Sequence, residues 1–375
     1  MKKYKLGDIC EIVSGRTPKT NIAEFWDGDV KWITPAELDE NTYVITDSVR
    51  KITNLAMQKT GLTAFPAGTV ILSSRAPIGK VAIAGCEMCC NQGFKNFICS
   101  EIVNNKYLYW FLKHNNAYLN SLGRGATFKE ISKSIVSSIE INLPSLEEQQ
   151  IVVDNIEKIS TIITLRKEEI SRLDDLIKAR FVEMFGEKYP EDTLLNLCNI
   201  IDYRGKTPEK VEYGLPFITA KNVKMHHMTL EPREYISKET YDKVMVRGFP
   251  KEGDVVFTTE APLGNVCRIP HFDTAFYIGQ RIVTMQTDIV NPTYLEYALS
   301  DEEFVRKYMG KSSGSTVTGI RVRLLEQLTI PVPPRALQDE FSIFVDQIDK
   351  SKATVQKALD ETQLLFDSLM QQYFG

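Results

Sequence analysis

The chain has 375 residues, of which 43% are hydrophobic and 25% charged, which is typical of a globular protein with two or three domains. No apolar run approaches the ~20 residues of a membrane span, and an early return to polar residues argues against a signal peptide. Seven irregularly spaced cysteines suit a reducing compartment better than a disulfide framework, so we expect a cytoplasmic protein.

Charge is unevenly distributed along the chain. The formal net charge of −4 argues at first against nucleic-acid binding, because DNA-binding proteins usually carry a basic excess. Much of the acid, however, lies in residues 146–186 and 335–375, whereas residues 1–145 have more Lys and Arg than Asp and Glu. The net charge therefore does not exclude a DNA partner.

Four segments follow one another along the chain. Residues 1–145 contain runs such as VKWIT, TVILSS and KVAIAG between Gly/Pro turns, which predict strands, and then a helical patch, NKYLYWFLKHNNAYLNSL. Residues 146–186 predict one long helix. Residues 187–334 repeat the mixed pattern with LPFITA, DVVFTT, NVCRIP and PTYLEYALSDEEFVRKYM, and residues 335–375 predict a second long helix. The predicted fold class is α+β, with two similar mixed α/β domains.

The second half of the chain echoes the first. SSRAPIGKV at 73–81 returns as TTEAPLGNV at 258–266, and VKWITPAEL at 30–38 returns as LPFITAKNV at 215–223. Further matches pair RTPK (16–19) with KTPE (206–209), GATFKEISKSIVSSIEINLP (125–144) with GSTVTGIRVRLLEQLTIPVP (314–333), and Phe185-Gly186 with Phe374-Gly375. Because so long a period marks duplicated domains, we predict an internal pseudo-two-fold repeat of units 1–186 and 187–375.

The two long helices carry heptad-spaced apolar residues. We expect them to pair as an antiparallel coiled coil, forming a spacer of roughly 50 Å, although a solvated amphipathic helix is the alternative. Polar residues interrupt the pattern at complementary places, Arg166 and Arg180 in the first helix and Lys352 and Thr362 in the second. The predicted helix-pairing residues are Ile156, Ile159, Ile163, Ile170, Leu173, Ile177, Val345, Ile348, Val355, Leu359 and Phe366.

These motifs resemble the specificity subunits of type I restriction–modification systems. The resemblance rests on SGRTPKTNIAEFWDGDVKWITPAEL (14–38), GTVILSSRAPIGKVAI (68–83) and the G-x-T…I…LP-S-L-E-E-Q helix entry (125–149), and recurs in YRGKTPE, LPFITAKNV, GDVVFTTEAPLGNV and PPRALQDEF. It implies two target-recognition domains (1–145 and 187–334), each reading half of a split DNA sequence, and two spacer helices (146–186 and 335–375). It also implies two methyltransferase subunits and a restriction subunit as partners, and no catalysis by the chain itself.

Other chemical signals are weaker. NPTY at 291–294 is close to the motif of adenine-N6 methyltransferases, which makes such an enzyme the alternative function, but Thr293 replaces a proline and the segment precedes a helix that Asn291 would cap. The cluster Cys86, Cys89, Cys90 and Cys99 and the pair His226-His227 lack the partners that a zinc site needs. We expect no catalytic residue, no cofactor and no metal site.

DNA contact is predicted from two stretches, 102–129 and 304–325, that have basic residues and no acidic ones. Each includes a glycine-bearing loop, LGRGATFK or GKSSGSTVTG, that could approach phosphates, although a solvated charge run is the alternative. Base readout needs Arg, Lys, Asn or Gln on loops, and the match of Arg75 with Glu260 in the repeat predicts different half-sites. The predicted DNA-contact residues are Arg16, Lys19, Arg75, Lys95, Asn96, Arg124, Thr127, Lys129, Arg204, Lys206, Lys221, Asn222, Gln280, Arg281, Lys311, Ser313, Thr316 and Arg321.

Overall fold

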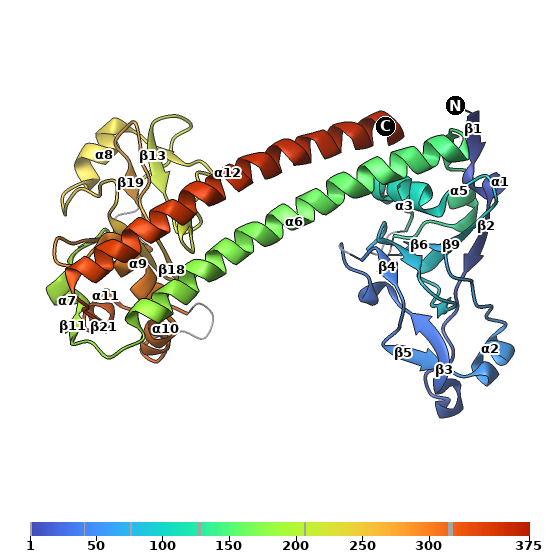
Figure 1. Ribbon diagram of the computed structural model, residues 1–375, viewed down its shortest axis with the longest axis horizontal. Helices are drawn as coiled ribbons and strands as arrows, with labels where there is room; N and C mark the ends of the chain where they lie inside the picture. The colour runs from blue at the N-terminus through green and yellow to red at the C-terminus, as the bar shows by residue number, and fades with distance from the viewer. Residues whose placement is uncertain (1, 41, 76, 126–128, 206–207, 314–317) are drawn as a thin grey trace. The chain divides into compact units, whose positions relative to one another are not determined.

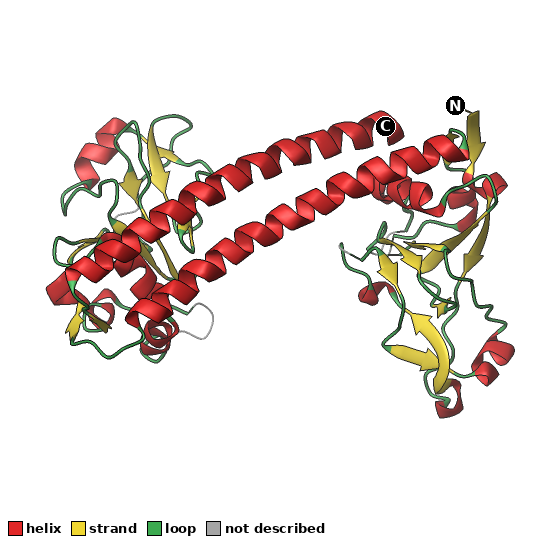
Figure 2. Ribbon diagram, viewed as in Figure 1, coloured by secondary structure: helices red, strands yellow, loops and turns green. Residues whose placement is uncertain are grey.

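The chain folds into two compact units in the computed structural model, which describes residues 2–40, 42–75, 77–125, 129–205, 208–313 and 318–375. The first unit is Met1–Lys167 with Lys357–Gly375, and the second is Glu168–Gln356. Both units contain part of the two long helices, α6 (Leu146–Phe185) and α12 (Arg335–Phe374) (Figure 1). Both also mix helices and strands, as the α+β class predicts (Figure 2).

The first unit is built on a five-stranded sheet of order β2-β9-β6-β7-β4 and a three-stranded sheet of order β5-β3-β8, and β1 pairs with β10. Its elements before α6 are β1 (Lys2–Lys5), α1 (Leu6–Ile9), β2 (Cys10–Ser14), η1 (Ala23–Phe25), β3 (Trp26–Ile33), η2 (Pro35–Glu37), β4 (Val44–Ile45), β5 (Arg50–Ile52), α2 (Asn54–Thr60), β6 (Val70–Ser73), β7 (Val81–Ala84), β8 (Cys89–Cys90), β9 (Phe94–Cys99), α3 (Asn105–His114), α4 (Asn116–Ser121), α5 (Lys133–Ser137) and β10 (Glu140–Leu143).

The second unit has a four-stranded sheet of order β12-β20-β17-β18, a three-stranded sheet of order β16-β13-β19, and the pairs β14-β15 and β11-β21. Its elements between the long helices are β11 (Glu191–Thr193), α7 (Leu194–Leu197), β12 (Asn199–Asp202), β13 (Leu215–Ile218), β14 (Val223–Lys224), β15 (His227–Met228), β16 (Tyr235–Ile236), α8 (Lys238–Val244), β17 (Val255–Thr259), β18 (Leu263–Arg268), β19 (Tyr277–Ile278), β20 (Ile282–Gln286), α9 (Pro292–Ser300), α10 (Glu302–Met309), α11 (Val322–Leu325) and β21 (Thr329–Pro331).

The central strand of each unit is buried on both faces. Side chains alternate across a strand, so Val70 and Leu72 of β6 enter the core that also holds α3 and Ile156 of α6, whereas Ile71 enters a second core. In the second unit, Val255 and Phe257 of β17 and the intervening Val256 divide between two cores in the same way. The internal repeat is confirmed, and in these two strands equivalent residues face equivalent cores.

Each predicted helical patch consists of two helices. In the first unit the patch divides into α3 and α4 at Asn115, whose amide donates to the carbonyl of Phe111 at 2.9 Å. In the second unit it divides into α9 and α10 at Asp301, whose side chain accepts from the Glu303 N–H at 2.9 Å. Side-chain bonds to the backbone end one helix and begin the next.

In the first unit, the amino-terminal part of α6 lies beside the carboxy-terminal part of α12. The guanidinium of Arg166 donates to the carbonyl of Ala358 and to the hydroxyl of Thr362, so two of the polar interruptions meet. Phe366 of α12 packs edge-on against Trp110 of α3, with ring centroids 5.8 Å apart. The polar side chain that interrupts the apolar face of α6 therefore hydrogen-bonds the polar side chain that interrupts the apolar face of α12.

In the second unit, the other ends of the two helices pair in the same manner. Lys352 forms an ion pair with Asp174, and Arg180 bonds Glu340 at 3.0 Å. The partner's number falls along α12 as the number rises along α6, so the helices are antiparallel, as predicted. Of the predicted pairing residues, Ile156, Ile163, Ile177, Val345 and Leu359 are buried, and Ile159, Ile170, Leu173, Ile348, Val355 and Phe366 are partly buried.

Replacing Phe341 tests this packing in the second unit. Its fully buried ring lies 5.5 Å from the ring of Phe181, 5.4 Å from Phe185 and 5.3 Å from Tyr297. We expect Phe341→Ala to lower the free energy of unfolding by about 3–5 kcal/mol, measured by urea denaturation. Ile343→Ala on the same helix, where Ile343 is 61% exposed, should change it by about 0.5 kcal/mol or less. Equal losses for the two variants would contradict this account.

Candidate nucleic-acid interface

A buried hydroxyl closes the repeated turn in both units. Between β6 and β7, Ser73 Oγ donates to the Pro77 carbonyl and accepts from the Lys80 N–H, both at 2.8 Å. Between β17 and β18, Thr258 Oγ1 accepts from the Asn265 N–H at 2.8 Å. Ser73 and Thr258 are both fully buried. The small polar residue that the two copies share therefore holds the turn together.

The glycine of the turn is required by its backbone and by a neighbouring helix. Gly79 has a φ of 96° and Gly264 a φ of 92°, a region that other residues rarely adopt. A Cβ on Gly79 would lie 2.4 Å from Asn116 Oδ1 of α4, and one on Gly264 would lie 2.2 Å from the Tyr308 hydroxyl oxygen of α10. The turn thus presses against the helix that leads to the glycine-bearing loop.

The structure brings the turn and the glycine-bearing loop together. In the first unit the Ile131 N–H donates to the Ser74 carbonyl at 2.9 Å, and Arg124 and Glu130 exchange backbone bonds at 3.0 and 2.9 Å. In the second unit the Ile320 N–H donates to the Thr259 carbonyl at 2.9 Å. Ser313 and Gly319 exchange backbone bonds there at 3.0 and 3.1 Å. We call this arrangement the turn–loop junction.

A carboxylate holds an arginine at the junction of the first unit. Arg75 Nε lies 2.9 Å from Glu130 Oε2, and the side chains are 44% and 34% exposed. Lys95 Nζ lies 3.4 Å from Glu130 Oε1 and 3.3 Å from Ser74 Oγ, with only 7% of the lysine side chain exposed. The single carboxylate of Glu130 therefore pairs with two cations, the half-exposed Arg75 and the buried Lys95.

The junction of the second unit reverses the charge of the turn. Glu260 stands where Arg75 stands in the first unit, and its Oε1 lies 2.9 Å from Arg281 Nε at the edge of β20. The two side chains are 43% and 53% exposed. Both junctions therefore present an arginine held at Nε by a carboxylate, although the carboxylate comes from the loop in one unit and from the turn in the other.

The other predicted DNA-contact residues are spread over each unit. In the first unit, Arg16 donates to the Thr60 carbonyl at 2.6 Å, and the Lys19 carbonyl accepts from the Trp26 indole at 3.2 Å, which places both beside the three-stranded sheet. In the second unit, Arg204 pairs with Asp202 at 3.2 Å. The exposed residues are Arg16, Lys19, Arg124, Lys129, Lys221, Arg281, Lys311, Ser313 and Arg321, and the partly exposed ones are Arg75, Arg204 and Gln280.

Three of the predicted residues lie in the interior, where they offer no group to a groove. Lys95 is 6% exposed, Asn96 is 0% exposed and bonds the Cys90 sulfur at 3.0 Å, and Asn222 is 1% exposed. The residue types could not show this, because Lys95 and Asn96 lie in β9, where four successive residues are buried, and Asn222 bonds the backbone of its own turn. Thr127, Lys206 and Thr316 lie outside the described residues.

Sequence reasoning missed Glu130, the pairing of Glu260 with Arg281, and the capping role of Asn222. Asn222 Oδ1 accepts from the Thr219 N–H at 2.9 Å, just as Glu37 Oε1 accepts from the Thr34 N–H at 2.7 Å at the equivalent place in the first unit. The signal was the Thr-x-x-Glu/Asn spacing, which is a capping pattern. For Glu130, the signal was its position directly after an acid-free stretch.

NPTY is a helix cap. Asn291 Oδ1 accepts from the Thr293 N–H at 2.8 Å at the start of α9, and its own N–H donates to Gln338 Oε1 of α12 at 2.7 Å. In the first unit, Asn104 caps α3 and its N–H donates to Gln149 Oε1 of α6 at 2.8 Å. The cap interpretation is confirmed. In both units the backbone N–H of the capping asparagine also bonds a glutamine side chain of a long helix.

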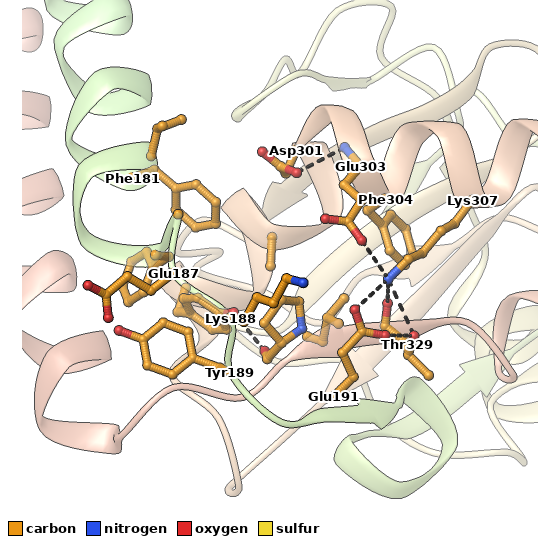
Figure 3. Close-up of a pocket in the computed structure, with 17 residues that line it drawn as sticks. Phe181, Glu187, Lys188, Tyr189, Glu191, Asp301, Glu303, Phe304, Lys307 and Thr329 are labelled. Atoms are coloured by element: carbon orange, nitrogen blue, oxygen red, sulfur yellow. Dashed lines mark hydrogen bonds and ion pairs between the residues drawn. The ribbon is translucent and has the colours of Figure 1, made fainter.

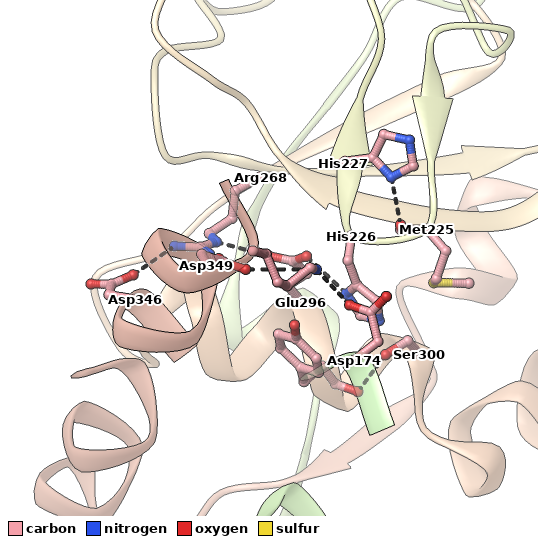
Figure 4. A network of polar contacts seen from close by, with 11 residues as sticks. Asp174, Met225, His226, His227, Arg268, Glu296, Ser300, Asp346 and Asp349 are labelled. Carbon is pink, nitrogen blue, oxygen red and sulfur yellow. Dashed lines mark hydrogen bonds and ion pairs between the residues drawn. The ribbon is translucent and has the colours of Figure 1, made fainter. Parts of the chain in front are cut away.

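His226 belongs to a polar network in the second unit rather than to a metal site (Figure 4). Its ring stacks on Tyr297 with centroids 4.2 Å apart, and its Nδ1 lies 2.9 Å from Glu296. Glu296 is 2% exposed and bonds Arg268 Nε at 2.8 Å. Arg268 reaches Asp349 of α12 at 3.5 Å, where burial raises the pKa of the aspartate. The network ties β18 and the β14–β15 loop to α9 and α12.

A cavity of the second unit and the thiols of the first lie apart from the turn–loop junction. A cavity of about 450 Å³ lies where α6 ends and is bordered by Phe181, Tyr189 and Lys307 (Figure 3), but none of the predicted DNA-contact residues lines it. Burial raises the pKa of the Cys89 and Cys90 thiols to about 12. Within the described ranges, no three metal-binding side chains gather, and no helix is long and apolar enough to cross a membrane.

Replacing the turn glycine tests the junction of the second unit. We expect Gly264→Ala to lower stability by more than the roughly 1–2 kcal/mol that a left-handed alanine costs, because the new Cβ meets the buried ring of Tyr308. Gly253→Ala is the matched control, since Gly253 has a φ of 82° and, apart from Gly253 and its two chain neighbours, no described residue has an atom within 4 Å of the place its Cβ would take. Thermal unfolding of both variants measures the difference, and a larger loss for Gly253→Ala would contradict the packing argument.

The chain is similar to DNA specificity subunits of type I restriction enzymes. The type I restriction modification DNA specificity domain matches residues 1–174 and again residues 189–362. The MjaIX specificity subunit of Methanocaldococcus jannaschii is 26% identical over 98% of this chain and 90% of its own length, and the MjaVIII specificity subunit is 21% identical over 94% and 89%.

Solved structures agree with this in fold. The type I restriction–modification S subunit from M. genitalium is 14% identical and covers 100% of this chain and 96% of its own, with a TM-score of 0.60. A chain from a study of complex assembly in the type I system gives the same TM-score at 21% identity, over 100% and 97%. Because the domain matches twice and together spans most of the sequence, this chain belongs to the type I restriction–modification DNA specificity family.

Proposed function

We propose that this chain reads an asymmetric, bipartite DNA sequence for a type I restriction–modification complex, with one half-site for each unit. The observation that carries the proposal is the turn–loop junction, which both units build with equivalent backbone bonds and different charged side chains. Side chains of different chemistry read different base edges, so a shared scaffold with diverged side chains suits two unlike half-sites.

The junction supplies groups for both phosphates and bases. Arg124 and Lys129 in the first unit and Lys311 and Arg321 in the second are exposed beside a glycine-bearing loop, which suits phosphate contact. Arg75 lies in the turn after β6 and Arg281 lies directly before β20, and we assign them to base readout. The contacts proposed to extend this surface are Arg16, Lys19, Arg204, Lys221, Gln280 and Ser313.

We further propose that the chain has no catalysis of its own and acts in the cytoplasm with two methyltransferase subunits, to which a restriction subunit adds. NPTY supports this view, because capping occupies the Asn291 side chain. Leu176 and Leu365 occupy equivalent positions on α6 and α12 and are 47% and 52% exposed. Two equivalent apolar positions suit two copies of one partner.

The paired helices, in this proposal, fix the number of base pairs between the half-sites. α6 and α12 each run unbroken for 40 residues, and a helix of that length spans about 60 Å. Cross-helix bonds within each unit, such as that between Lys352 and Asp174, hold the two helices in register.

Mapping adenine methylation tests the function as a whole. The gene would be expressed beside its methyltransferase partner in a host that lacks the system, and methylated sites compared with those of the partner alone. We expect one bipartite motif that depends on this chain. S-adenosylmethionine binding by the purified chain alone would contradict the non-catalytic role.

Arginine substitutions separate the two half-sites. We expect Arg75→Ala to relax recognition of one half-site and Arg281→Ala to relax recognition of the other, because a lost bidentate contact costs about 1–3 kcal/mol. The measurement is the methylation motif, scored separately for each half. Uniform weakening over all sequences would instead mark the arginine as a phosphate contact.

Lengthening the helices tests their role as a spacer. Seven residues inserted after Ile163 of α6 and seven after Leu364 of α12 keep the pairing seen between Arg166 and Thr362 in register. The added length of about 10 Å corresponds to roughly three base pairs at ~3.4 Å each. We expect the methylation motif to keep both half-sites and gain that spacing. The same seven residues placed after Gly375 serve as control, and an unchanged spacing with full activity would show that the helices do not set the spacing.

A further inference from the structure

In each unit a glutamate pairs with the Nε of an arginine at the turn–loop junction, although the two pairs do not occupy equivalent positions of the repeat. Arg75 is bound at Nε by Glu130 at 2.9 Å, and Arg281 is bound at Nε by Glu260, also at 2.9 Å. The carboxylate comes from the loop in the first unit and from the turn in the second, so the pair is not inherited from one position in the repeat. What the units share is the geometry of the arginine.

That geometry selects the edge that an arginine offers to DNA. A guanidinium has five N–H groups in a planar fork. A carboxylate at Nε leaves the end-on pair of donors free, one N–H from each Nη atom, and this pair points away along the side chain. The paired Nη donors match the O6 and N7 acceptors of guanine in the major groove, and no other base presents two acceptors side by side there.

The carboxylate also disfavours the wrong partner. A free arginine binds any phosphate, which gives affinity without sequence information. An arginine already paired with Glu130 or Glu260 gains less from a phosphate, and the carboxylate itself repels the backbone. Because Glu130 and Glu260 are 34% and 43% exposed, their charge is felt at the surface where DNA would approach.

We infer that Glu130 and Glu260 are positioning residues that commit Arg75 and Arg281 to guanine, so each half-site contains one guanine that its arginine reads end-on. The inference rests on the proposed function and deepens it, because it names a base in each half of the target. Lys95, buried and 3.4 Å from Glu130, holds the first carboxylate in place.

Single-atom changes in DNA test the inference. The full complex with its methyltransferase subunits would be titrated against duplexes that carry the mapped site, with each guanine replaced in turn by 7-deazaguanine, which lacks the N7 acceptor. We expect one position in each half-site where the change weakens binding about tenfold. The penalty should vanish in Arg75→Ala for one half-site and in Arg281→Ala for the other.

The positioning role has its own readout. Glu130→Gln should remove most of the 7-deazaguanine penalty in its half-site while tightening binding to unrelated duplex. It should also steepen the plot of log K against log salt by about 0.9, the value for one new phosphate contact. Glu260→Gln should do the same for the other half-site. A purely structural role would weaken specific and unrelated DNA alike and would leave the salt slope unchanged.

Matched variants complete the test. Glu231→Gln breaks an ion pair with the same Nε geometry, to Arg233 at 2.9 Å, and Glu140→Gln breaks the pair with Lys3 at 2.6 Å. Both should keep the penalty and the salt slope. Arg75→Lys keeps the charge but not the fork, and should lose the penalty even if the Gln variants unfold.

Three results would overturn the inference while leaving the proposed function intact. These are a mapped half-site without a G·C pair, a penalty that persists unchanged in Glu130→Gln and Glu260→Gln, or a penalty that persists in Arg75→Lys. If the unmodified complex does not prefer its mapped site to unrelated DNA, the proposed function itself fails, and the inference fails with it.

Discussion

The proposed interface depends on one backbone hydrogen bond in each unit, from Ile131 to Ser74 and from Ile320 to Thr259. These bonds join a turn between two sheet strands to a loop that follows the helical patch, so residues 57 and 61 positions apart in sequence meet at one surface. The turn can accept the loop because a buried hydroxyl closes it and a left-handed glycine lets it pack against a helix. Without that contact, the basic loop and the arginine of the turn or strand would be separate features.

The repeat separates what is structural from what varies. Both units keep the buried hydroxyl of the turn, on Ser73 or Thr258, and the glycine of the turn. Both also keep a glutamine on the long helix that accepts from the N–H of a capping asparagine. Each of these groups is buried, where an unpaired polar atom or a clash is costly. The junction side chains are half-exposed, so charge can be exchanged between turn, strand and loop at little cost in stability. This difference in burial supports the proposal that a common scaffold reads two unlike half-sites.

The type of a polar residue did not reveal whether its side chain is free to contact DNA. Asn96, Asn222 and Asn291 all have the chemistry of base readout or of a flipped-base pocket, yet each is committed to an internal bond: to a cysteine sulfur, to a threonine N–H and to the first turn of a helix. An amide satisfies backbone donors as readily as base edges. The choice between the two depends on burial, which a residue's type does not reveal. The ion pairs of the junction depend in the same way on the tertiary structure, which decides which carboxylate lies beside each arginine.

The sequence by itself determined the duplication, the α+β class, the two long helices and the family, because these depend on periodicity and on ordered motifs that repeat along the chain. It also showed that polar residues interrupt the apolar pattern of each helix, but that Arg166 bonds Thr362 across the pair is seen only in the structure. Only the tertiary structure decided which basic residues are exposed, that turn and loop form one junction, and that Glu130 and Glu260 hold arginines there. The physical reason is that strand register and long-range contact fix burial and ion pairing, and neither leaves a local trace in sequence.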